Sequence, residues 1–407
     1  MSCMHSRSRL LPGPDLDQVA AALGASLTAA VVAFWGVVAF HHEKPYRPVI
    51  VADSIPTPAA AEDLPSPPPG GLRIRLGFAG DLMQFGEQRN DDFRGSYALV
   101  APHIRSLDLA GGNLEFPVDS TLPAGPDPGT VRFNGSPAHL DAIVEAGFDV
   151  AQTANNHTYD RGLDGLLRTL ASVRARGLRP VGTDTTRARL DADPVLVEVK
   201  GVRLAFRAYS TPPNTYLDPA GRPGWVPRDV PMDALDFEHW RDADRAHGQA
   251  LFRSHVAQAR AARAGLVIAM VHWGRQYYLA PSADQRRAAH DLVDAGYDLV
   301  IGTHSHVLVP PELYRGRLIA YSLGNFLSQT VSPETSVGAV LDVDLVEHGG
   351  RVVVAGFRYR ATEVRLPGHV VTPIDSTRSG RDAAAWAVAR RVLGRALVPW
   401  DSVVAQR

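Results

Sequence analysis

The chain has 407 residues, of which 45% are hydrophobic and 21% are charged, and this composition excludes a disordered or fibrous protein. Its 42 basic and 43 acidic residues leave a net charge of −1, which argues against a basic nucleic-acid binder, so we expect no nucleic-acid partner. The single cysteine, Cys3, excludes an intrachain disulfide framework and a cysteine zinc cluster. Any metal site must therefore use histidine, carboxylate and amide side chains.

The first feature along the chain is an uncharged apolar stretch from Val19 to Phe40. At a rise of 1.5 Å per residue it gives a helix of about 33 Å, enough to cross a bilayer core of roughly 30 Å. A buried core helix rarely runs this long, and a cleaved signal peptide needs a small-residue site directly after the apolar stretch. Such a site, residues 59–61, lies only far downstream. We therefore predict a transmembrane anchor over residues 18–40, preceded by a short cytoplasmic tail over residues 1–17.

A proline-rich segment follows the predicted anchor. Eight prolines lie between residues 45 and 69, and Gly70 and Gly71 close the segment. Such a sequence forms a semi-rigid extended tether. We predict a linker over residues 41–71 that holds a globular domain away from the membrane, in a single-pass cell-membrane protein whose domain lies outside the cytoplasm. The basic residues on the two sides of the anchor are balanced and do not fix this orientation.

From residue 72 onward, strand and helix patterns alternate. This alternation predicts a mixed α/β domain over residues 72–370, in which helices cover a central pair of sheets, followed by a C-terminal helical extension over residues 371–407. The predicted strands are 72–79, 149–151, 266–271, 299–301 and 318–323, the hairpins are 195–209 and 337–364, and the helices are 137–146, 163–173, 241–264, 281–295 and 383–397.

One pattern occurs twice along the chain. Residues 146–150 and 295–299 share a helix end, a glycine, an aromatic residue, an aspartate and the start of a strand. His157 and His306 each stand seven residues after these segments. In α/β folds, sites assemble at the carboxyl ends of strands, so we expect both histidines at one sheet edge.

Five segments place polar, metal-ligating groups at or near predicted strand ends. Each alone has an ordinary structural explanation, such as a turn, a helix cap or a hydrogen-bonded histidine. Together they predict a metal site, because imidazole and carboxylate ligands suit zinc, iron and manganese. The segments are Gly80-Asp81, Gly112-Asn113-Leu114-Glu115, Asn155-Asn156-His157, His272-Trp273-Gly274 and Gly302-Thr303-His304-Ser305-His306.

In this order, the motifs resemble those of the poly-γ-glutamate capsule-synthesis protein family, which is similar to a branch of the calcineurin-like metallophosphoesterases. The resemblance covers roughly residues 72–330 and implies a four-layer α/β/β/α sandwich. The matching motifs are Gly80-Asp81-Leu82-Met83, Asn113-Leu114-Glu115-Phe116-Pro117, the run from Asn155 to Gly162, Val271-His272-Trp273-Gly274, Gly302-Thr303-His304-Ser305-His306-Val307 and Tyr321-Ser322-Leu323-Gly324-Asn325-Phe326.

The resemblance also implies a role for each matching residue, around one or two divalent ions (manganese, iron or zinc). The first ion would be held by Asp81 and His306, with Glu115 bridging to the second. His157 would protonate a leaving group. The second ion would take Asn156, His272 and His304, and the outer shell or substrate contacts would come from Asn113, Asp160, Trp273, Gln276 and Asn325.

Two positions depart from the resembling patterns. Met83 stands where the wider phosphoesterase plan has a histidine ligand, and Gln276 stands where the capsule family often has a glutamate. The resemblance implies a membrane-anchored protein that assists the synthesis, export or anchoring of an anionic cell-surface polymer, with other membrane subunits as partners. The alternatives are a metal-dependent hydrolase of phosphoesters or of the polymer, and a non-catalytic, metal-stabilised binding module.

Overall fold

The computed structural model describes residues 55–85, 88, 92–125, 132–216, 229–329, 332–375 and 380–400, all within one compact unit, Arg47–Arg407. The predicted anchor over residues 18–40 lies outside the described residues. Across the part of the chain that is described, no helix combines the length and the apolar character needed to cross a membrane.

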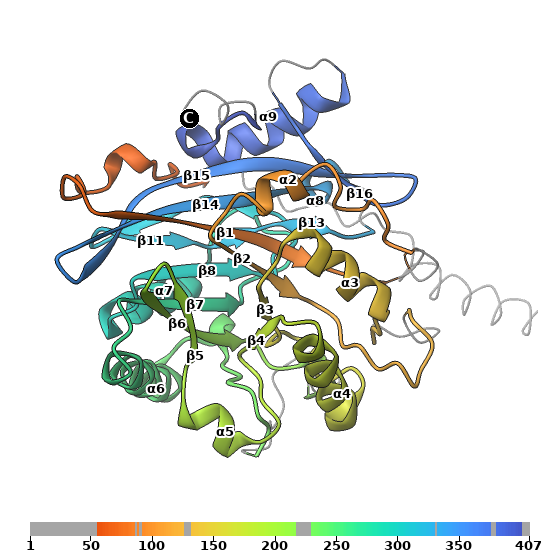
Figure 1. Ribbon diagram of the computed structural model, residues 1–407, viewed down its shortest axis with the longest axis horizontal. Helices are drawn as coiled ribbons and strands as arrows, with labels where there is room; N and C mark the ends of the chain where they lie inside the picture. The colour runs from red at the N-terminus through yellow and green to blue at the C-terminus, as the bar shows by residue number, and fades with distance from the viewer. Residues whose placement is uncertain are drawn as a thin grey trace, which may run out of the picture. The chain divides into compact units, whose positions relative to one another are not determined.

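Two large sheets form the centre of this unit, which confirms the predicted mixed α/β fold (Figure 1). The larger has the order β16-β15-β14-β1-β2-β3-β4, with β13 also paired to β1. Strands β1 to β4 run parallel, whereas β14, β15 and β16 extend the sheet antiparallel. The bounds are β1 Leu72–Leu82, β2 Leu109–Leu114, β3 Val150–Gln152, β4 Arg179–Val181, β13 Asn325–Leu327, β14 Val337–His348, β15 Arg351–Arg365 and β16 Val370–Pro373.

The second sheet has the order β10-β11-β8-β7-β6-β5, with β6, β7, β8 and β11 parallel. The predicted hairpin over residues 195–209 is confirmed as β5 and β6, with its turn at Lys200 and Gly201. A separate short pair joins β9 to β12. The bounds are β5 Val195–Val199, β6 Val202–Ser210, β7 Leu266–His272, β8 Leu299–Thr303, β9 Leu308–Val309, β10 Glu312–Tyr314, β11 Arg317–Ala320 and β12 Ser322–Leu323.

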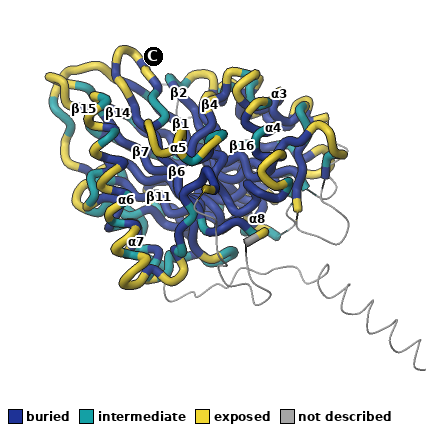
Figure 2. Tube along the Cα trace, turned by 90° about the horizontal axis from the view of Figure 1, so that it is seen from below, coloured by how far each residue is buried: buried dark blue, intermediate teal, exposed yellow. Residues whose placement is uncertain are grey.

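Helices cover the outer faces of both sheets (Figure 1). Side chains alternate along a strand, so on β7 Ile268 and Met270 enter the core between the sheets while Val267 and Ala269 face helices α6 and α7. Figure 2 shows the buried strands inside this exposed helical cover. The helices are α2 Ala101–Ile104, α3 Pro137–Ala146, α4 Gly162–Ala175, α5 Arg187–Ala192, α6 Asp242–Ala261, α7 Ala283–Ala295, α8 Pro333–Ser336 and α9 Arg381–Leu393.

The repeated sequence pattern has a repeated structural cause. Gly147 and Gly296 end α3 and α7 in the left-handed conformation, with φ of 103° and 111°, which glycine adopts without steric cost. The following aspartates then fix the neighbouring strands: Asp149 accepts a hydrogen bond from the backbone N–H of Ala110, and Asp298 accepts one from that of Val267. These bonds set the register that aligns the strand ends of each sheet.

Some predicted boundaries differ from the structure. The strand predicted over residues 318–323 is divided at Tyr321, because β11 pairs with β8 whereas β12 turns away to pair with β9. The terminal helix ends at Leu393, where Gly394 takes a positive φ. Part of the predicted linker packs on the domain through buried Ala60 and Leu64, and the boundary predicted after residue 370 falls inside β16.

The backbone of β1 at Gly80 packs closely against Gly324. A Cβ at this position would lie 1.9 Å from the carbonyl oxygen of Gly324, next to the backbone bond from Asp81 N–H to that oxygen. We expect Gly80→Ala to lower the melting temperature by several degrees, since overpacking costs about 1–3 kcal/mol. Gly356→Ala is the matched control, because its Cβ would stand 3.4 Å from the nearest atom. Equal melting temperatures for the two variants in a calorimetric scan would contradict this close packing.

Candidate metal centre

The predicted ligands meet where parallel strands of the two sheets end. Asp81 and Asn113 lie one residue before the ends of β1 and β2, and the segment from Asn155 to His157 follows β3 after two intervening residues. The other sheet contributes His272 as the last residue of β7, and His304 and His306 from the loop after β8. Parallel strands present their carboxyl ends at one edge, which brings together residues far apart in the sequence.

The five charged or titratable ligands form two overlapping clusters. In one, single side-chain atoms of Asp81, Glu115 and His306 lie within 4.8 Å of one another, and in the other those of Glu115, His272 and His304 do so. Glu115 belongs to both clusters. All five side chains are buried. The arrangement therefore has two possible cation positions that share one carboxylate, in the division that the resemblance implied.

Asn113 connects the ligands. Its amide N–H₂ donates to Asp81 Oδ1 over 2.8 Å and to Glu115 Oε2 over 3.3 Å, while its carbonyl accepts from Asn155 Nδ2 over 3.2 Å. The prediction placed residues 112–115 in a turn, but Asn113 is part of strand β2, and this rigid position fixes the direction of its amide. Asn155 also donates to the carbonyl of Leu114 over 2.8 Å. The bonds from Asn113 therefore hold one oxygen of each carboxylate, Asp81 Oδ1 and Glu115 Oε2, and leave the second oxygen of each without a bond from this amide.

The second oxygen of each carboxylate is available to bind a cation. Asp81 Oδ2 and Glu115 Oε1 are fully buried and accept no hydrogen bond. In the described part of the chain, no arginine or lysine lies within 4.0 Å of either carboxylate. A buried carboxylate is costly unless it is paired or binds a metal. These carboxylate oxygens, together with the neighbouring imidazoles, are therefore suitable ligands for divalent ions.

The second cluster is crowded with electron-rich atoms. His272 Nε2 lies 2.9 Å from Asn156 Oδ1, 2.9 Å from His304 Nδ1 and 3.4 Å from Glu115 Oε1. A single imidazole N–H cannot donate to three acceptors, whereas one cation satisfies all of them. The opposite nitrogen, Nδ1 of His272, lies 3.0 Å from Thr303 Oγ1, the kind of contact that orients a metal-binding imidazole. Thr303 was missing from the predicted site.

The first cluster is held in a similar way. His306 Nδ1 lies 3.2 Å from Asp81 Oδ2 and 3.0 Å from Asn325 Oδ1, and the Asn325 amide donates to the backbone carbonyls of His306 and Thr335. His304 and His306 have φ of 93° and 56°, a left-handed conformation that costs energy in residues other than glycine. Both strained residues are in the centre, so the fold maintains this strain to direct their rings.

Burial and charge shift the pKa values of the ligands. Burial, followed by the charge of Asp81, raises the pKa of Glu115 well above its usual value. Burial opposes ionisation of Asp81 as well, but the close contact and charge of His306, whose Nδ1 lies 3.2 Å from Asp81 Oδ2, outweigh it and leave the pKa of Asp81 lowered. Burial and then the neighbouring histidines lower the pKa of His272 well below its usual value and that of His304 to about 3. Both imidazoles are therefore neutral at pH 7, as metal ligands must be.

His157 stands beside the centre in a dyad. Its Nδ1 lies 2.7 Å from Asp160 Oδ2, which also accepts the backbone N–H of Phe133 over 2.7 Å. The Phe133 ring stacks on the imidazole, with centroids 3.9 Å apart and planes inclined by 16°. Phe133 was not predicted, because nothing in its local sequence indicates a ring that contacts His157.

The remaining predicted residues take different places. Trp273 lies in the core under α6 and α7, where its indole N–H donates to the carbonyl of Tyr321. The buried Met83 packs in the core under α3 and supplies no imidazole ligand. Gln276 is partly exposed in the loop after β7. In that loop Tyr277, with φ of 67°, lies beside His306 at 5.7 Å between ring centroids, and it too was missing from the predicted site.

The fold and the site define an α/β protein with a buried histidine–carboxylate centre suited to divalent cations. The sequence profile of the bacterial capsule synthesis protein PGA_cap family matches residues 75–330. The chain belongs to this family.

Similar proteins have related names. The chain is 27% identical over 283 residues to the PGA biosynthesis protein CapA of Bacillus subtilis, a match that spans 68% of this chain and 69% of that protein. It is 28% identical over 259 residues to the capsule biosynthesis protein CapA of Bacillus anthracis, spanning 62% of this chain and 58% of that one. Among solved structures, the calcineurin-like phosphoesterase YfkN from Bacillus subtilis has a TM-score of 0.42 and 14% identity, over 79% of this chain and 97% of YfkN.

Glu115 provides a test of the centre through stability. A carboxyl whose folded pKa is raised destabilises the metal-free fold as the pH rises above its usual value of 4.5. With EDTA at pH 7 we expect Glu115→Gln to melt several degrees higher than the unaltered chain, and we expect this difference to vanish near pH 4. With added Mn²⁺ or Zn²⁺ the order should reverse, because a ligand stabilises only the form that binds it.

Glu198→Gln, an exposed change on β5, is the control and should shift neither melting curve. Two results would contradict a metal-binding role for the buried Glu115 carboxylate. One is a Glu115→Gln variant that melts below the unaltered chain in EDTA, and the other is a variant whose melting temperature still rises when metal is added.

Proposed function

We propose that this protein is a membrane-anchored, divalent-metal-dependent hydrolase that assists the synthesis, export or anchoring of an anionic capsule polymer. The observation that carries the proposal is the position of Glu115, shared between two histidine-containing clusters, with the His157–Asp160 dyad next to them. A purely structural ion needs no such dyad. The names of the relatives, a PGA biosynthesis protein and a capsule biosynthesis protein, support a capsule polymer as the material handled.

The residues present can hold two ions. Asp81 and His306 would hold one and His272, His304 and Asn156 the other, with Glu115 between them; zinc, manganese and iron suit these ligands. Divalent ions there supply the positive charge that offsets negative charge developing at a reacting phosphoryl or carbonyl oxygen. Helices on the outer faces of two packed sheets support the four-layer arrangement typical of metallophosphoesterases.

His157 is the proton donor in this scheme. In the imidazolium form of His157, the Asp160 carboxylate accepts the hydrogen on Nδ1, and the hydrogen on Nε2 is left to protonate the leaving oxygen or nitrogen, which leaves a neutral imidazole. The backbone N–H of Phe133 fixes the carboxylate, and its ring limits rotation of the imidazole. The chain therefore orients the Nε2–H of this imidazolium beside the centre.

Replacing His157 separates turnover from metal binding. We expect His157→Ala to keep the metal content of the unaltered chain and to lower turnover of a chromogenic phosphodiester by about 10²- to 10⁴-fold, the usual contribution of a general acid. His239→Ala, which removes an exposed histidine, should change neither quantity. Elemental analysis and initial rates measure the two effects.

Two other outcomes would change the conclusion. Unchanged turnover in His157→Ala would reject the proton-donor role. Metal retained by an unaltered chain that hydrolyses neither phosphodiesters nor acidic polymers would indicate a metal-stabilised binding module instead.

The proposed anchor has its own test. A chain lacking residues 1–44 should leave the membrane pellet on fractionation, whereas the full chain should stay in it, because the uncharged stretch from Val19 to Phe40 is removed. A truncated chain that remains in the pellet would show that another surface binds the membrane.

A further inference from the structure

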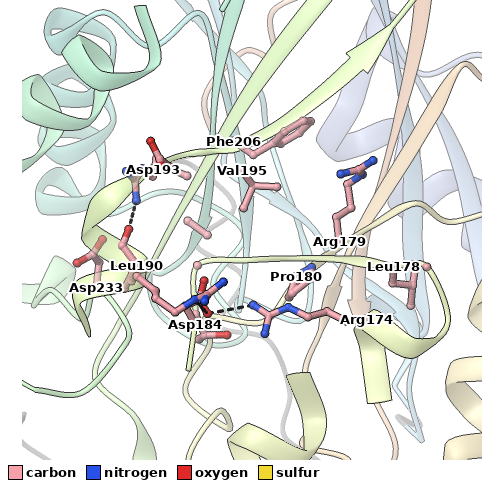
Figure 3. Close-up of a pocket in the computed structure, with 16 residues that line it drawn as sticks. Arg174, Leu178, Arg179, Pro180, Asp184, Leu190, Asp193, Val195, Phe206 and Asp233 are labelled. Atoms are coloured by element: carbon pink, nitrogen blue, oxygen red, sulfur yellow. Dashed lines mark hydrogen bonds and ion pairs between the residues drawn. The ribbon is translucent and has the colours of Figure 1, made fainter. Parts of the chain in front are cut away.

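A cavity whose lining includes none of the metal-centre residues lies between the edges of the two sheets (Figure 3). Strand β4 is the last strand of the larger sheet and β5 the last of the smaller one, and both contribute to its walls. The volume of about 440 Å³ is within the range of ligand sites. The cavity is one strand away from β3, which leads to Asn155, and Thr183 on its wall bonds Thr153 over 2.6 Å.

Part of the wall is apolar. Leu178 and Pro180 stand on the β4 side, and Val195 and Phe206 stand on the side of the other sheet (Figure 3). Ala208 completes this set. Such a wall favours the methylene groups of a ligand.

Four arginines and three aspartates supply the charge of the cavity. Asp184 pairs with Arg174 over 3.1 Å, seen in Figure 3, and with Arg189 over 3.4 Å, so that two cations share one carboxylate. The second aspartate, Asp233, pairs with Arg187, which lies outside the lining, over 2.6 Å. The third, Asp193, is exposed.

The other two arginines of the lining have no carboxylate within 4.0 Å among the described residues. Arg179 is exposed on β4. Arg207 is buried at 3% exposure; its guanidinium donates to the carbonyl of Leu190 and to Gln258 Oε1, while its Nε is buried and has no hydrogen-bond partner. The nearest opposite charge is Asp233 on the same wall, which lies beyond ion-pair distance. The unpartnered Nε–H of Arg207 therefore leaves a buried donor that an anion in the cavity could satisfy.

We propose that this cavity binds a segment of a linear polycarboxylate, and so holds the polymer next to the metal centre. The identity of the polymer rests on the proposed function. A chain of γ-linked glutamates has methylene groups along its backbone and one pendant carboxylate per unit. The methylene groups match the apolar wall, and the carboxylates match Arg179 and Arg207, since guanidinium binds carboxylate through paired hydrogen bonds.

The test measures binding of a fluorescent γ-linked glutamate decamer to the full chain in detergent, by anisotropy. We expect Arg179→Gln to weaken binding about tenfold, a loss of about 1.4 kcal/mol, and Arg179→Glu to weaken it further. Arg179 is exposed and its side chain makes no described ion pair, so both variants should keep the unaltered melting temperature. Arg203→Gln is the matched control, because Arg203 is exposed on β6 and donates to the carbonyl of Ala262, away from the cavity.

Two further arms distinguish the cavity from a general polyanion site and from the metal centre. A γ-linked glutamine decamer should bind at least tenfold more weakly than the glutamate decamer, and polyphosphate should not compete at equal charge. His272→Ala, which removes a residue of the metal centre, should retain decamer binding.

Each remaining outcome overturns the proposal in a recognisable way. Decamer binding that survives Arg179→Glu but is lost in His272→Ala would place the polymer at the metal centre alone and leave the proposed function intact. Equal competition by polyphosphate would show a general polyanion site. Absence of decamer binding would reject the cavity as a polymer site, whereas the metal content and turnover of the same preparation would still decide the proposed function.

Discussion

The structure depends on two buried carboxylates that have no arginine or lysine partner among the described residues. Asp81 and Glu115 come from neighbouring strand ends, and their uncommitted oxygens point to the space where three imidazoles converge. In water-excluded surroundings both negative charges are costly, and a cation between them would offset that cost. Elements around the centre follow from this constraint: the Asn113 amide that orients both carboxylates, the left-handed backbone of His304 and His306, and the Thr303 and Asn325 contacts that direct the rings.

The two sheets make this arrangement possible because each brings half of the ligands. The larger sheet presents the carboxylates and the Asn155–His157 segment, and the smaller one presents the three histidines that could bind a metal. The centre therefore exists only when the sheets pack through their shared core. A cation bound at this centre would therefore favour packing of the two sheets and would add to the stability of the unit.

The sequence predicted the elements that its local chemistry specifies. Helix α3 and the two hairpins follow from periodicity and from turn glycines, and the ligands follow from polar groups at strand ends. What could not be predicted depends on tertiary contacts. The break at Tyr321 arises because β12 changes its partner, Trp273 turns into the core beside a ligand, and Phe133 contacts His157 only through the folded chain. The cavity between β4 and β5 is invisible in the sequence because its arginines belong to separate elements.

The most direct test of the shared carboxylate is anomalous diffraction from crystals of the manganese-loaded protein. We predict two anomalous peaks on either side of the Glu115 carboxylate, one beside Asp81 and His306 and the other beside His272 and His304. Anomalous peaks at other positions would contradict a carboxylate shared between two cations. So would the absence of peaks, if elemental analysis shows that the protein takes up no metal on loading.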